Sequence, residues 1–139
     1  ESIVFYIVFL FLRTYAGGVH AKTETTCILL TTFALTVSVI CIRILSQIQR
    51  RSCAILLLIG SCLCILLFSP LDTIEKPLTS IEKIKYRSIC YRIVLLCVAG
   101  AVFTYILQLD TFFYSIVIGV FLENILLLVG ITFYKLKFT

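Results

Sequence analysis

Long apolar runs separated by short polar intervals dominate the chain. Four runs read as membrane-crossing helices, at residues 27–42, 53–68, 89–109 and 112–133. A crossing needs about 20 apolar residues, so the two shorter runs are expected to place polar ends at the lipid headgroups. A fifth run, at 3–12, is too short to cross and is either part of a truncated helix or an interfacial segment. The pattern predicts an all-α fold, a polytopic transmembrane bundle with four crossings and a partial N-terminal segment.

Composition favours a membrane protein over a soluble domain. The 139 residues are 61% hydrophobic and 14% charged, whereas soluble domains carry roughly a quarter charged residues. Mean hydropathy is +1.15. We therefore expect one integral-membrane domain over residues 1–139. The chain begins at Glu1 and contains no methionine, so we expect that a natural N-terminal portion precedes it.

Positive charge is distributed unevenly along the chain. If crossings alternate, one side of the membrane holds the 13–26 interval, the 69–92 region and the C-terminus. That side carries nine of the twelve basic residues, namely Arg13, Lys22, Lys76, Lys83, Lys85, Arg87, Arg92, Lys135 and Lys137. The other side carries Arg43, Arg50 and Arg51. Because Lys and Arg are enriched in cytoplasmic loops, the 13–26 interval is predicted to face the cytoplasm, where thiols stay reduced.

The same interval holds the only histidine, His20, and Cys27 follows seven residues later. A cysteine nucleophile acts as the thiolate, and His20 could serve as its general base. The Thr23–Thr26 run supplies capping hydroxyls that would place Cys27 in a first helical turn, where the helix dipole favours the thiolate. Seven residues of continuous helix rise about 10.5 Å, so a His–Cys contact requires a bend, which the Gly17–Gly18 pair permits. The alternative is an interfacial histidine beside a small apolar cysteine.

Other polar residues inside apolar runs are weaker candidates. Glu123 and Asn124 interrupt the last run, where polar side chains are costly and often functional; they either contact substrate or pack against another helix. The remaining cysteines are interpreted as small buried hydrophobes; they are Cys41, Cys53, Cys62, Cys64, Cys90 and Cys97. One histidine and one nearby cysteine make only half a zinc site, so no metal is expected. No Gly-x4-Gly-Lys-Ser/Thr loop occurs, so no ATP or other cofactor is expected.

The residues Thr79 to Glu82 fit a capping box and predict a helix start. A basic stretch follows, with Lys83, Lys85, Arg87 and Arg92. We interpret it as a topology determinant that contacts anionic lipids, or as a surface that attracts an acidic peptide.

Two blocks of the sequence resemble the accessory gene regulator protein B family. The first comprises Arg13, the string Ala16-Gly17-Gly18-Val19-His20-Ala21-Lys22, and Cys27; the second runs from Ser69 to Leu78. The family comprises bacterial integral-membrane cysteine endopeptidases that cut and cyclise quorum-sensing pro-peptides. The resemblance implies that His20 and Cys27 are catalytic. It also suggests substrate-binding roles for Gly17, Gly18 and Arg13, although contact with a lipid headgroup explains Arg13 equally well. Asp72 and Lys76 match the second block without an assigned role.

The reaction implied by the resemblance begins when Cys27, activated by His20, attacks a pro-peptide carbonyl and expels the C-terminal part. An internal cysteine or serine of the substrate then attacks the resulting thioester and closes a thiolactone or lactone. The expected partners are membrane lipids, the short pro-peptide and, as one option, a second copy of the chain in a homodimer. Nucleic acid is not expected, because the positive charge lies along membrane boundaries. The expected location is the bacterial cell membrane, multi-pass, with the active site facing the cytoplasm.

A non-enzymatic membrane protein is the alternative from another functional class. In a transporter subunit or pore former, Gln108, Asp110, Glu123 and Asn124 would line a polar path through the bundle.

Overall fold

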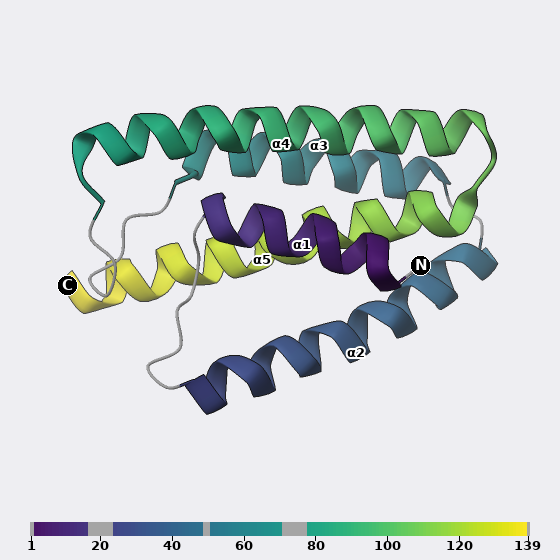
Figure 1. Cartoon of the computed structure of the whole chain (residues 1–139). Coiled ribbons are helices and arrows are strands. Elements are labelled where there is room, and N and C mark those ends of the chain that lie inside the picture. The colour runs from purple at the N-terminus through teal and green to yellow at the C-terminus, as the bar shows by residue number, and fades with distance from the viewer. Residues whose placement is uncertain (1, 17–23, 49–50, 71–77, 139) are drawn as a thin grey trace.

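Five α-helices form the described part of the chain in a computed structural model (Figure 1). They are α1 (Ser2–Ala16), α2 (Glu24–Ile48), α3 (Arg51–Phe68), α4 (Ser80–Ile106) and α5 (Asp110–Phe138). The structure describes residues 2–16, 24–48, 51–70 and 78–138, without the side chains at 2, 24–28, 30–31, 35, 45–46 and 133–138. Over these residues the secondary structure is entirely helix and connecting turn, which confirms the predicted all-α fold.

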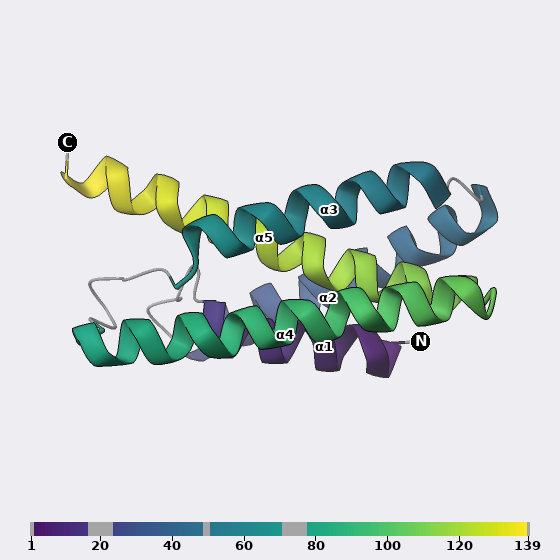
Figure 2. The same cartoon turned by 90° about the horizontal axis from the view of Figure 1, so that it is seen from above.

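Helix α5 is the centre of the bundle and packs against each of the other four helices. All eight residues from 113 to 120 are buried. A helix that is apolar on every face must be surrounded by other helices or lipid. The view from above shows α5 running between α3 and the layer formed by α4 and α1 (Figure 2).

Three of the described helices are long and apolar enough to cross a membrane: α3, α4 over Ser80–Ile106, and α5 over Asp110–Thr132. The run at 27–42 lies within α2, whose described apolar stretch, Thr32–Ile44, is shorter than a span. The chain is therefore a helical membrane protein, and a crossing by α2 stays a prediction.

One face of helix α1 is buried in the bundle. Phe5, Phe9, Leu12 and Ala16 recur every three or four residues and are 0–4% exposed, which is the spacing of one helix face. This face packs against α5 and α4. Of the two interpretations of the first apolar run, packing along α5 favours a bundle helix over an interfacial segment.

The helices alternate in direction, as alternating crossings predict. Figure 1 shows that α1, α3 and α5 end, and α2 and α4 begin, near the C-terminus of the chain. We call this the C-terminal end of the bundle. At the opposite end α2 and α4 end, and α3 and α5 begin (Figure 1).

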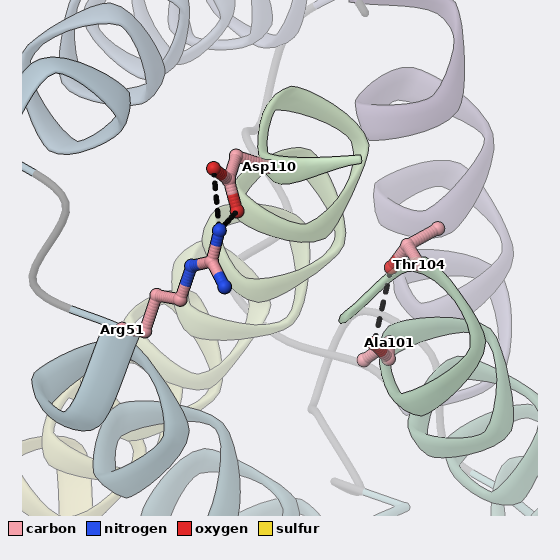
Figure 3. A network of polar contacts seen from close by, with 4 residues as sticks. All are labelled: Arg51, Ala101, Thr104 and Asp110. Atoms are coloured by element: carbon pink, nitrogen blue, oxygen red, sulfur yellow. Dashed lines mark hydrogen bonds and ion pairs between the residues drawn. The ribbon is translucent and has the colours of Figure 1, made fainter. Parts of the chain in front are cut away.

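An ion pair joins the starts of α3 and α5 at the opposite end of the bundle. Arg51, the first residue of α3, lies 2.8 Å from a carboxylate oxygen of Asp110, the first residue of α5 (Figure 3). The guanidinium also lies 5.7 Å from the ring centre of Tyr105. Because the two charged side chains are 33% and 25% exposed, this pair is expected to contribute only about 0–1 kcal/mol to stability.

The connection between α4 and α5 comprises residues 107–109 and so lies within the predicted crossing at 89–109, not after it. Helix α4 ends at Ile106, and Gln108 adopts a left-handed φ of 55°. In the last turn of α4, the Thr104 hydroxyl donates to the Ala101 carbonyl at 3.0 Å (Figure 3). Asp110 thereby falls in the first turn of α5, where a negative charge stabilises the helix dipole.

The start of α4 confirms the predicted capping box. Thr79 is the N-cap; its hydroxyl accepts from the Glu82 N–H at 3.3 Å, and its own N–H donates to the Glu82 carboxylate at 2.9 Å. Both exposed N–H groups are thus satisfied reciprocally.

Candidate functional site

The structure places the nucleophile candidate at the C-terminal end of the bundle. Cys27 is the fourth residue of α2 and so lies in its first turn, as predicted, although its side chain is not described. Several other candidates lie outside the described residues, namely Gly17, Gly18, His20, Asp72 and Lys76. The end of α1 and the start of α2, which flank His20 in the sequence, both lie at this end of the bundle (Figure 1).

Glu123, on α5, is the most deeply buried carboxylate described. Its side chain is 0% exposed, and within the described chain neither carboxylate oxygen has a hydrogen-bond partner. The guanidinium of Arg13 is close enough for its charge to stabilise that of Glu123. Removing an ion from water costs several kcal/mol unless nearby charges and hydrogen bonds compensate. An ionised carboxylate at this position therefore relies on the nearby charge of Arg13.

Arg13 and Asn124 extend the polar interior around Glu123. Arg13 is half-buried in the last turn of α1, and its Nη1 atom is shielded from solvent. Asn124 is 7% exposed, and its Oδ1 atom accepts no hydrogen bond from the described residues. Two neighbouring residues of α5 thus carry buried oxygen atoms that accept no hydrogen bond from the described residues.

Ser69 connects the end of α3 with α1 and α4. It directly follows α3 and is buried, with its Oγ 3.4 Å from the Ala16 carbonyl oxygen and 3.3 Å from the Cys90 sulfur. A hydroxyl carries one proton, so it donates to one of these acceptors at a time. Cys90, on α4, also lies within electrostatic range of Glu123. We call Arg13, Ser69, Cys90, Glu123 and Asn124 the polar cluster.

Sequence reasoning missed two members of this cluster. Ser69 opens the second family-like block, and that position was its only signal. Cys90 was interpreted as a small apolar residue, and nothing in its neighbourhood distinguished it from the other cysteines. The interpretation of all six cysteines outside the His20–Cys27 interval as buried residues was also too broad. Cys62, Cys90 and Cys97 are buried, but Cys41 and Cys64 are half-buried and Cys53 is exposed.

The comparison with protein families decides the identity of the chain. The model of the family described as Accessory gene regulator B matches residues 1–128. The chain belongs to the accessory gene regulator B family. Membership confirms the resemblance seen in the two sequence blocks and associates the chain with accessory gene regulation and quorum-sensing peptide processing. Compared with curated proteins and with solved structures, the chain has no match.

The matched region contains every candidate site residue of this accessory gene regulator B chain. It covers α1 to α4 and most of α5, and includes both family-like blocks and the whole polar cluster. The match therefore spans the buried polar residues as well as the His20–Cys27 interval.

Proposed function

We propose that the chain is a membrane-embedded cysteine endopeptidase that cleaves a short quorum-sensing pro-peptide and cyclises its N-terminal part. Cys27 is the nucleophile and His20 the general base. The family match over residues 1–128 is the observation that carries the proposal. The position of Cys27 in the first turn of α2 supports it, because the positive end of a helix dipole stabilises a thiolate.

The reaction proceeds through two acyl transfers. His20 takes the Cys27 proton, the thiolate attacks the scissile carbonyl carbon, and the C–N bond breaks as His20 returns the proton to the leaving amine. The N-terminal part of the substrate is then held as a thioester. A substrate cysteine attacks this thioester, which releases Cys27 and closes a thiolactone; a substrate serine gives a lactone. Because one thioester is exchanged for another, the cyclisation to a thiolactone requires no ATP.

In this proposal the pro-peptide binds at the C-terminal end of the bundle, which we assign to the cytoplasmic side. Lys83 and Lys85, both exposed in the first turns of α4, lie at this end. With other basic residues of α4 they form a positive surface that can draw in an acidic pro-peptide tail.

Charge reversal at this surface should weaken substrate capture. We expect the double substitution Lys83→Glu and Lys85→Glu to raise KM about threefold to tenfold at low salt while kcat stays unchanged, because exposed charges act mainly on encounter. Higher salt should shrink the difference. The matched control is Arg43→Glu, an exposed basic position on α2 in its half nearer the opposite end. Equal KM values for all three proteins would leave lipid contact as the role of the basic surface.

Selective thiol labelling tests the enzyme assignment directly. The full chain, reconstituted in vesicles, is treated with a pro-peptide analogue that carries a thiol-reactive group at the scissile carbonyl, and modified peptides are mapped by mass spectrometry. We expect modification of Cys27 in preference to the other six cysteines, including Cys53, which is exposed on the bundle. Indifferent labelling of the seven thiols would contradict the assignment.

The pore or transporter alternative receives less support. It needs Gln108, Asp110, Glu123 and Asn124 along one path. Asp110 is instead paired with Arg51 at the opposite end, and Gln108 is exposed in the α4–α5 turn. Only Glu123 and Asn124 contribute to the bundle interior.

A further inference from the structure

The buried carboxylate of Glu123 differs from the other two carboxylates whose contacts are described. Asp110 is paired with Arg51, and Glu82 completes the capping box of α4. Glu123 has no hydrogen-bond donor among the described residues, yet it is 0% exposed. A carboxylate in this position is stable as an ion only beside a compensating positive charge, since an uncompensated buried ion is strongly destabilising.

The packing of α1 on α5 places a positively charged residue, Arg13, at a height along the bundle similar to that of Glu123. The two helices run in the same direction (Figure 1) and touch where Gly119 meets Phe5 and Val8. Arg13 lies five residues beyond Val8, and Glu123 lies four residues beyond Gly119. At about 1.5 Å per residue these offsets are roughly 7.5 and 6 Å along parallel axes. Arg13 and Glu123 therefore lie at a similar height along the two packed helices.

We propose that Glu123 is a positioning residue: its carboxylate is the buried counter-charge of Arg13 and fixes the last turn of α1, where the chain leaves for residues 17–23. The same turn is held a second time at the Ala16 carbonyl, by the Ser69 hydroxyl. Both restraints act on the end of α1 that leads directly to His20. Arg13 accordingly serves the site by pairing with Glu123, rather than by binding the substrate or a lipid headgroup.

A thermal double-mutant cycle tests the pair without any substrate. The full chain is purified in detergent micelles as wild type, Arg13→Gln, Glu123→Gln and the double variant. We expect Arg13→Gln to lower Tm by about 10 °C, because it leaves a buried carboxylate uncompensated. Glu123→Gln should lower Tm by less, since the long Arg13 side chain can extend toward the end of the bundle. The double variant should recover most of the loss; strictly additive losses would overturn the pairing.

Cleavage kinetics of the same variants, which rest on the proposed function, distinguish a positioning role of Arg13 from a role in substrate binding. Below Tm and per folded molecule, we expect Arg13→Gln to lower kcat at least tenfold with KM nearly unchanged. The double variant should return to within about threefold of wild-type kcat. A double variant as inactive as Arg13→Gln would show that Arg13 acts on the substrate and would overturn the positioning role. Unchanged kcat in both single variants would overturn it as well, by showing a role in stability alone.

The control is Arg51→Gln, which breaks the ion pair at the opposite end of the bundle. It should lower Tm slightly, because that pair is partly exposed, and leave kcat unchanged. A tenfold loss of kcat in Arg51→Gln would show that any broken ion pair impairs the enzyme, and would overturn a specific role for Glu123. If even the wild type leaves the pro-peptide intact while the Tm cycle shows coupling, the proposed function fails and the counter-charge assignment is supported.

Discussion

Alanine at Cys27 is expected to eliminate pro-peptide cleavage, and alanine at His20 to reduce it by about 10²–10⁴-fold or more. The first substitution removes the only atom that can form the acyl-enzyme. The second removes the general base, a contribution typically of that size. When nucleophile and base act as one unit, losing either costs nearly as much as losing both, so the double variant should be no worse than Cys27→Ala.

The measurement is cleavage of a synthetic pro-peptide by the full chain in vesicles, followed by mass spectrometry of linear and cyclic products. Cys41→Ala is the matched control, because Cys41 is a half-buried thiol on the same helix, α2. It should process the peptide at the wild-type rate. All variants should reach the membrane in equal amounts. Persistent cleavage by Cys27→Ala or by His20→Ala would contradict the catalytic assignment.

Much of the helical framework could be predicted from the sequence, because it depends on local features. The apolar runs locate α3, α4 and α5, and the reciprocal hydrogen bonds of Thr79 and Glu82 are determined by residues three positions apart. The threonines before Cys27 likewise predict its place in the first turn of α2, where the structure has it. Short-range hydrogen bonding and hydropathy are sufficient for each of these predictions.

The pairing inside the bundle could not be predicted in the same way. Arg13 and Glu123 lie 110 positions apart, and nothing in either local sequence indicates that α1 and α5 run side by side. Ser69 and Cys90 meet only because the end of α3 lies beside α4. The left-handed backbone at Gln108 was also hidden, because a glutamine gives no signal for the conformation that glycine adopts readily.

Two sets of polar residues in the bundle differ in burial and in their distance from the His20 segment along the chain. Arg51 and Asp110 pair at the opposite end, where partial exposure limits the value of the interaction. Arg13, Glu123 and Ser69 lie toward the end from which the His20 segment departs. Buried polar groups are retained there at a cost in stability, which is expected where a reacting segment must be held in one place.

The close contact of Gly119 on α5 with Phe5 and Val8 on α1 gives the second large effect. A Cβ atom added at Gly119 would lie 3.1 Å from a Val8 methyl carbon and 3.4 Å from the Phe5 carbonyl oxygen. Valine adds two further methyl groups, and the carbonyl is part of a helix backbone that cannot rotate away. We therefore expect Gly119→Val to destabilise the chain by about 1–3 kcal/mol, measured as a fall in Tm of several degrees in micelles.

The same substitution should also impair cleavage, since moving α1 away from α5 separates Arg13 from Glu123. Gly60→Val on α3 is the matched control, because a Cβ at Gly60 meets nothing within 4 Å; it should leave Tm and kcat near the wild-type values. Gly119→Ala should fall between the two, because alanine favours the helix by roughly 0.5–1 kcal/mol over glycine but crowds Val8. If Gly119→Val and Gly60→Val had equal Tm values, close packing at Gly119 would not be what holds α1 in register with Glu123.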